Sequence, residues 1–296
     1  EQQLPVVQSR IAQFTNKPDG LKAATQVIRA SSEEKKESIA LKKLYAWILM
    51  EAKDYAHAFE LYRTLDGIIK ANGKELFEFA ERAFRDKEYI TAAVAYNDVL
   101  QRYKSFPQRV NAQFGLAHTI EELNGATDSA TIAQKKELNF PIDNETAIDL
   151  YTQAAHTQPK TELAAVCYLR IAIIQNEKYN NGQAAYTALA QLQQNVPLTS
   201  PLRIEGKLLN ADIYLQEGDT LQAKELLIGI VTEKRINSSQ KEMAAYRIAE
   251  LHYYNGNFAL ASKQLEDLTK LLTTDIANDA LQLKLFIDEH SKSEAF

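Results

Sequence analysis

The sequence has little that would interrupt a helix and little that would cross-link a fold. Of its 296 residues only 10 are glycine and 7 are proline, and Cys167 is the one cysteine, which excludes an internal disulfide. No apolar run approaches the roughly 20 residues that a helix needs to cross a bilayer. Alanine, leucine, glutamine, glutamate and lysine are plentiful, and these residues favour helix because they lose little side-chain freedom in it.

A concentration of charge of one sign is also absent. The net charge is −5, and both signs are spread along the chain. Proteins that coat a nucleic-acid duplex carry a basic patch that neutralises phosphates. We therefore expect no nucleic-acid partner, and the lack of a long apolar run predicts no direct membrane span.

Patterns that carry catalysis or hold metals are missing. The five histidines include no pair four residues apart, which is the spacing of zinc-protease ligands. His118 could share a helical face with a carboxylate of Glu121 or Glu122, but two ligands are too few for zinc. There is no glycine-rich phosphate loop and no serine elbow, and Cys167 lies in an apolar stretch typical of a buried thiol. We expect no enzymatic activity, no catalytic residue, no metal and no cofactor.

What the sequence does contain is a repeat. Two stretches align at a distance of 34 residues, and each begins at a turn and continues into a helix-forming run. The aligned pairs are Tyr55/Tyr89, Ala58/Ala92 and Tyr62/Tyr96.

A second regularity joins alanines 12 residues apart across a predicted turn. Small residues let two antiparallel helices cross closely, while larger residues flank the contact. In one unit the interval is 30 residues, from Ala117 to Ala147, which indicates an insertion at about 125–143. The regular pairs are Ala12/Ala24, Ala46/Ala58, Ala80/Ala92, Ala172/Ala184, Ala211/Ala223 and Ala249/Ala261.

With this period, these paired alanines and its turn-aromatic signature, the sequence resembles the tetratricopeptide repeat (TPR) family from about Pro5 to about Leu272. The resemblance implies an all-α fold: a right-handed α-α superhelix, a TPR-like solenoid of about seven helical hairpins plus a C-terminal capping helix. It also implies a single domain over residues 1–296. The family's early first-helix tryptophan is absent, since Trp47 follows the small residue, and later units have intervals of 37 to 39 residues.

The capping helix is predicted over Asp275 to His290, with Asp275 as its N-cap. It would cover the apolar face that the last repeat otherwise leaves exposed. The residues expected to pack on that repeat are Ile276, Ala280, Leu283 and Ile287.

In the TPR family the first helix of each hairpin lines a concave groove, and the resemblance implies the same here. The inward positions would lie six and three residues before each first-helix alanine, and one, four and five after it. Aromatic side chains and arginine carry much of the energy of protein interfaces. For each aromatic residue the alternative is core packing between adjacent first helices. The predicted partner-binding residues are Lys43, Trp47, Met50, Lys74, Phe77, Glu81, Phe84, Arg85, Phe114 and His118.

The insertion is a second candidate site. We expect it to contain a short helix near Ser129 to Leu138 and to lie across the groove; the alternative is a tolerated surface loop.

These features predict a non-enzymatic scaffold that binds a protein or a peptide. The stretch Ala92 to Pro107 resembles units of bacterial envelope repeat proteins, which suggests a periplasmic or cell-envelope location and a role in assembly or secretion. The alternatives are a cytoplasmic adaptor, a peptide-sensing regulator, or an enzyme-associated or sugar-binding role. The sequence leaves the partner's identity and the oligomeric state open.

Overall fold

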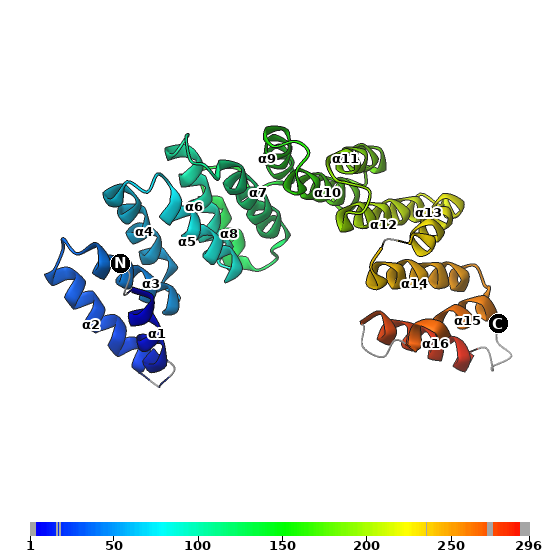
Figure 1. Ribbon diagram of the computed structural model, residues 1–296, viewed down its shortest axis with the longest axis horizontal. Helices are drawn as coiled ribbons and strands as arrows, with labels where there is room; N and C mark the ends of the chain where they lie inside the picture. Colours follow the sequence, from blue (N-terminus) through cyan, green and yellow to red (C-terminus); the bar gives the residue numbers. More distant parts are fainter. Residues whose placement is uncertain (1–3, 16, 18, 235, 271–274, 291–296) are drawn as a thin grey trace. The chain divides into compact units, whose positions relative to one another are not determined.

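The computed structural model describes residues 4–15, 17, 19–234, 236–270 and 275–290. This described part contains sixteen α-helices and no strand, so the predicted all-α class is confirmed (Figure 1). The chain folds into two compact units, residues 1–154 and 155–296, and each is described by itself. The single domain expected over 1–296 stays a prediction.

The first unit consists of helical hairpins that follow one another along the chain. Helix α2 packs on α3, α3 on α4, α4 on α5, α5 on α6 and α6 on α7, and first helices also touch, as α5 touches α7. The helices are α1 (Leu4–Thr15), α2 (Gly20–Glu34), α3 (Ile39–Glu51), α4 (Tyr55–Ile69), α5 (Lys74–Arg85), α6 (Tyr89–Arg102), α7 (Arg109–Gly125), α8 (Ser129–Glu137) and α9 (Asn144–Thr157), whose last residues fall in the second unit.

The second unit repeats this pattern, with each helix packed on the next and α10, α12 and α14 also in contact along the row. Its helices are α10 (Glu162–Glu177), α11 (Gly182–Asn195), α12 (Pro201–Gln216), α13 (Thr220–Thr232), α14 (Ser238–Tyr254), α15 (Phe258–Thr269) and α16 (Asp275–His290). Together the described helices make seven hairpins, one inserted helix and one final helix, as the sequence predicts.

A tight turn joins the two helices of most hairpins. Three residues separate α3 from α4, and the middle one, Lys53, has a φ of 57°. The amide of the next residue, Asp54, donates a 2.9 Å hydrogen bond to the Leu49 carbonyl, and its carboxylate caps α4. The left-handed Lys53 ends α3, and Asp54 begins α4. Both residues help to satisfy backbone groups that a helix end leaves unpaired.

The buried alanines confirm most of the predicted pairs. The side chains at these positions have no exposed surface, so two helix backbones meet there without a larger group between them. They are Ala46, Ala58, Ala80, Ala92, Ala117, Ala147, Ala172, Ala211, Ala223, Ala249 and Ala261. The first hairpin differs, since Ala12 and Ala24 are only half-buried.

The fifth hairpin corrects one predicted pair. Four residues, rather than three, separate Glu177 at the end of α10 from Gly182 at the start of α11. The Asn181 amide therefore donates to the Gln175 carbonyl, six residues back. The extra residue moves the close contact one place along α11, so Ala185 is the fully buried alanine and the predicted Ala184 is half-buried.

The insertion between α7 and α9 holds the short helix expected there, as α8. This helix has no buried side chain, and it packs on α6, the second helix of the previous hairpin. The Lys135 ammonium donates a 2.8 Å hydrogen bond to the Leu123 carbonyl near the end of α7. This position does not support the hypothesis that the insertion crosses the face of the first helices.

The final helix, α16, packs against α14 and α15 as predicted. Ile276, Ala280 and Ile287 are buried, and Leu283 packs on the same cluster. The predicted N-cap side chain, that of Asp275, lies outside the described residues. The helix still leaves Leu281 and Leu285 exposed on its other side.

Candidate partner-binding site

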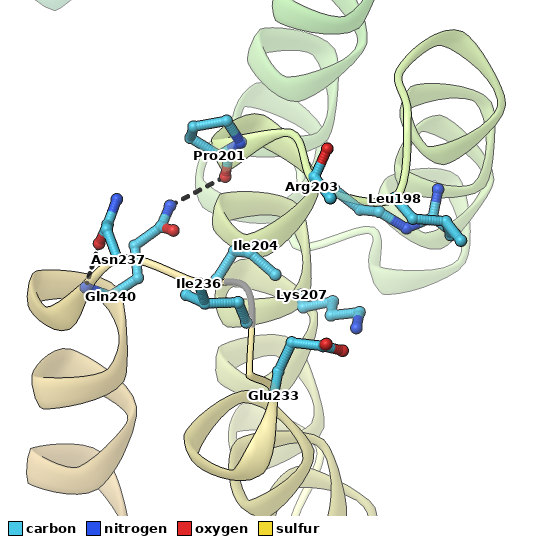
Figure 2. Close-up of a pocket in the computed structure, with 10 residues that line it drawn as sticks. Leu198, Pro201, Arg203, Ile204, Lys207, Glu233, Ile236, Asn237 and Gln240 are labelled. Atoms are coloured by element: carbon cyan, nitrogen blue, oxygen red, sulfur yellow. Dashed lines mark hydrogen bonds between the residues drawn. The ribbon is translucent and has the colours of Figure 1, made fainter.

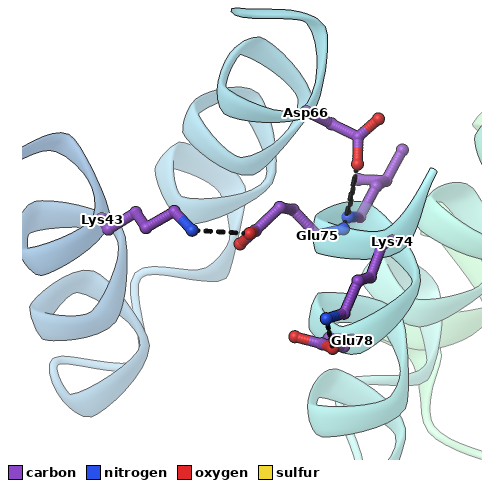
Figure 3. Close-up of polar contacts among 6 residues, drawn as sticks. Lys43, Asp66, Lys74, Glu75 and Glu78 are labelled. Atoms are coloured by element: carbon purple, nitrogen blue, oxygen red, sulfur yellow. Dashed lines mark hydrogen bonds and ion pairs between the residues drawn. The ribbon is translucent and has the colours of Figure 1, made fainter. Parts of the chain in front are cut away.

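Helix α5 begins at a carboxylate supplied by the hairpin before it. Asp66, fully buried in α4, accepts hydrogen bonds from the backbone amides of Gly73 at 2.8 Å and Glu75 at 2.9 Å. Figure 3 shows the Asp66 carboxylate directed at the start of α5. A negative charge at a helix N-terminus is favourable because it faces unpaired amides and the positive end of the helix dipole. This contact fixes the start of α5 and therefore which of its side chains face outward.

The outward side of α5 meets that of α7 in a row of rings. The Phe84 and His118 ring centroids lie 4.8 Å apart, and those of His118 and Phe114 lie 5.8 Å apart. Tyr89 extends the row at one end, 5.4 Å from Phe84, and Tyr151 at the other, 5.6 Å from Phe114. We call these five side chains the aromatic row. Phe84, His118 and Phe114 are half-buried, so part of each ring remains open to a partner.

Carboxylates border the aromatic row. The Tyr151 hydroxyl donates a 2.9 Å hydrogen bond to Glu121, and the Tyr96 hydroxyl donates one of 3.3 Å to Glu81. His118 Nε2 lies 3.6 Å from a Glu122 oxygen. Burial raises the pKa of Tyr96, and the nearby Glu81 carboxylate raises it further, so this hydroxyl stays a hydrogen-bond donor.

The charge of this face is therefore acidic. By formal charge Glu81, Glu121 and Glu122 contribute −3 and the exposed Arg85 contributes +1, which gives −2. Carboxylates next to ring faces attract a cation, because the negative face of an aromatic ring adds to the field of the acids. The surface thus favours a partner with basic and apolar groups.

Two of the predicted groove residues lie in the core instead. Met50 is 1% exposed, and Phe77 is 5% exposed, with its ring 5.3 Å from that of Phe106 and 6.0 Å from that of Tyr96. Large side chains of α6 and of the segment after it cover Phe77, which is why it packs inward. The prediction that these two residues line a groove is corrected.

The remaining predicted residues lie away from the aromatic row. The Lys43 ammonium pairs with Glu75 at 2.7 Å and joins α3 to α5, while Lys74 lies 3.7 Å from Glu78 (Figure 3). Trp47 packs on the cluster formed by Ile28, Leu44 and Ile48 near the first hairpin. Of the ten predicted residues, the structure brings together the rings of Phe84, His118 and Phe114, and Glu81 and Arg85 lie on the same helix as Phe84, near the Tyr96 hydroxyl.

Tyr89, which is half-buried, was missed as a site residue, and the fully buried Tyr151 was missed as a ring that packs on Phe114. Both belong to second helices, and the sequence places them at repeat-packing positions. The sequence held one signal for them. Helix α7 follows Tyr89 and precedes Tyr151, and it carries Glu121 and Glu122, which a tyrosine hydroxyl can reach. Contact between a second helix and a neighbouring first helix is what adds them to the row.

Elsewhere the structure shows less that resembles a site. No group of three or more His, Cys, Asp or Glu side chains in the described part of the chain could hold a metal ion. None of the helices described is both long and apolar enough to cross a membrane. Cys167 is buried, as expected of a structural thiol.

Comparisons with known proteins bear on the fold. No protein-family model and no curated protein sequence matches this chain. Among solved structures, yeast Tom70 aligns over 95% of this chain and 63% of the Tom70 chain, with a TM-score of 0.51 and 11% identity. The chain has a TPR-like repeat fold.

Two further structures share these TPR-like repeats less closely. Kinesin light chain TPR-like repeats of Podosopora anserina align over 68% of this chain and 97% of theirs, at 19% identity and a TM-score of 0.48. PilW, a type IV pilus biogenesis factor, aligns over 82% and 98%, at 13% identity and a TM-score of 0.43. At such identities the likeness concerns the fold, and the TPR-like chain spans less than two thirds of the Tom70 chain.

Proposed function

We propose that this TPR-like chain is a scaffold that binds a protein or a peptide, and that the half-buried rings of the aromatic row on α5 and α7 are its binding surface. The observation that carries the proposal is the contact of Phe84, His118 and Phe114, which are neighbours on adjacent first helices and are each half-buried. Half-buried rings offer a preformed apolar surface whose side chains are already held in place.

The charges around the row support a protein partner with basic groups. Ring faces bind apolar or cationic side chains, and Glu81, Glu121 and Glu122 add a negative field. A net negative face also repels the phosphate backbone of a nucleic acid. The expectation of no nucleic-acid partner remains a prediction, and an RNA-binding assay on the wild-type chain tests it.

The test is capture of partners from the native cell on wild-type chain and on Phe84→Ala and Phe114→Ala. Each substitution removes a ring but leaves α5 and α7 in place, and we expect the captured partner to bind at least about tenfold more weakly. Ile68→Ala is the matched control, since Ile68 is an exposed apolar residue on α4, and it should bind as wild type does.

Equal capture by all four proteins would refute the assignment of the row. Circular dichroism melting of each variant separates loss of binding from loss of fold. Adding labelled single-stranded RNA to wild-type chain in a filter-binding assay tests the nucleic-acid expectation.

We further propose a cell-envelope role, in assembly or secretion, on the sequence likeness of Ala92 to Pro107 alone. A large folded partner found in the envelope fraction supports it. A short, tightly bound peptide in the cytoplasmic fraction supports the peptide-sensing regulator, and a large cytoplasmic partner supports the adaptor.

A further inference from the structure

A cavity of about 420 Å³ opens in the second unit, far along the sequence from the aromatic row (Figure 2). It lies where the first turns of α12 and α14 meet the end of α13. Ligand sites generally span about 300–1,000 Å³, so this one suits a small ligand. Its lining is Leu198, Thr199, Pro201, Arg203, Ile204, Lys207, Glu233, Ile236, Asn237 and Gln240.

Two cations from one helix face this cavity. Arg203 and Lys207 are four residues apart on α12, so they project from the same side one turn from each other. A guanidinium nitrogen of Arg203 donates a 2.7 Å hydrogen bond to the Gln193 carbonyl, which holds the group at the cavity. Lys207 is half-buried, and within the described residues its ammonium makes no hydrogen bond or ion pair.

One carboxylate, that of Glu233, faces the same space, so the charged lining sums to +2 − 1 = +1. In the described part of the chain Glu233 pairs with neither cation, and Figure 2 shows it beside Lys207 with no bond drawn between them. The Glu233 carboxylate is exposed and stays hydrated, whereas the Lys207 ammonium is half-buried. An anion bound in the cavity would therefore stabilise the Lys207 ammonium more than it would destabilise the Glu233 carboxylate.

The ends of two helices add to this positive field and keep it in place. The Asn237 side chain caps α14 by accepting a 2.9 Å hydrogen bond from the Gln240 amide. Gln240 Nε2 then donates a 2.9 Å bond to the Pro201 carbonyl in the first turn of α12. The N-termini of α12 and α14 are thus tied together at the cavity, and both present the positive ends of their dipoles.

Part of the lining is apolar. Ile204 is 3% exposed, and Ile236 is half-buried and lies beside it in Figure 2. Leu198 is 77% exposed at the edge, an unusual amount for a leucine that borders a cavity. A ligand that covered Leu198 would remove apolar surface from water.

We propose that this cavity binds a carboxylate carried on a short apolar body, with the carboxylate at Lys207 and Arg203 and the hydrocarbon against Leu198, Ile204 and Ile236. The same chemistry has two sources, a free short-chain carboxylic acid or the C-terminal residue of a peptide. The proposal does not depend on the aromatic row, since the two sites share no residue.

Calorimetric titration of the full chain with hexanoate, hexan-1-ol and hexylamine tests the charge. We expect hexanoate to bind and the alcohol and amine to bind at least about tenfold more weakly, because only the acid pairs with Lys207. A peptide ending in leucine, as the free acid and as the C-terminal amide, distinguishes the source. Binding of hexanoate assigns a free acid; binding of the peptide acid alone assigns a chain end.

Two variants test the residues. Lys207→Gln should weaken the binding ligand at least about tenfold, while Lys263→Gln, an exposed lysine on α15, should not change it. Leu198→Ser, at a site too exposed to affect folding, should weaken it as well. Equal binding of acid, alcohol and amine, no binding of any probe, or an unchanged affinity in Lys207→Gln would overturn the proposal.

Discussion

The ring of Tyr96 in α6 occupies the space beside Gly115 in α7: a β-carbon on Gly115 would lie 2.5 Å from Tyr96 Cζ. Tyr96 is 2% exposed and hydrogen-bonds to Glu81, so the ring cannot turn aside. Two consecutive hairpins therefore meet through a glycine and a tyrosine. Gly115 is adjacent to Phe114 and three residues before His118 in α7. The close approach of α6 at Gly115 therefore sets where these two rings of the aromatic row lie.

Gly115→Ala should destabilise the chain by about 1–3 kcal/mol, since the added methyl forces a packed ring to move. The measurement is the free energy of unfolding in urea. Gly67→Ala, at an exposed position of α4 where the new β-carbon meets no neighbouring side chain within 4 Å, should instead stabilise by up to about 1 kcal/mol through helix propensity. Equal effects of the two substitutions would mean that the close approach is absent.

The four-residue turn of the fifth hairpin makes a prediction about two adjacent alanines. Ala185→Leu should cost about 1–3 kcal/mol because its side chain has no exposed surface, whereas Ala184→Leu should change stability by less than about 0.5 kcal/mol. Thermal melts of the two variants compare neighbouring positions in one helix. A larger loss of stability in Ala184→Leu would show that Ala184, 12 residues after Ala172, is the buried partner after all.

Removal of the buried carboxylate of Asp66 should be costly. Asp66→Ala leaves the amides of Gly73 and Glu75 without their acceptor, and we expect a loss of about 2–4 kcal/mol. Asp219→Ala removes an exposed N-cap that accepts one 3.1 Å bond from the Gln222 amide and should cost about 1 kcal/mol. Urea unfolding of both variants gives the comparison, and similar losses would show that burial of Asp66 adds nothing.

The single thiol should be protected at alkaline pH. Burial raises the pKa of Cys167 from 9.0 to about 12, so the folded chain keeps the proton over a range where the unfolded chain loses it. The stability that this provides is complete below about pH 9 and is lost as the pH rises through about 12. Relative to Cys167→Ala, wild type should therefore lose stability between these values.

Alkylation of Cys167 at pH 8.5 should be at least about 100-fold slower in native chain than in urea, because the reagent needs an exposed thiolate. A matched control moves the thiol to an exposed position: Ser239→Cys in the Cys167→Ala background should react at the rate of a free thiol. Rapid labelling of native wild-type chain would contradict the buried position.

Much of the fold could be predicted from the sequence, because the period and the paired alanines follow from how helices pack. The turn residues Lys53, Asp54 and Gly218 mark helix ends by local chemistry, which needs no knowledge of distant residues. The shift of the buried alanine in the fifth hairpin was not predicted, because one added turn residue moves the contact without changing the composition of either helix.

The site was predictable only in part. Phe77 and Phe114 occupy the same position relative to their alanines, yet Phe77 is buried and Phe114 is half-buried. The difference comes from the neighbours: Tyr96 of α6 and Phe106, in the segment after α6, cover Phe77. Spacing within one helix cannot tell how large the side chains are that neighbouring segments place against it.

Within each unit the helices touch neighbours one or two places along the chain. A force applied to the two ends of either unit would therefore act in series through every hairpin, and the least anchored hairpin would yield first. In the first unit that hairpin is α1 and α2, since α1 has no buried side chain and α2 buries only Ile28 and Ser32. Stretching would release this hairpin at low load while α5 and α7, with their rings in contact, stayed folded.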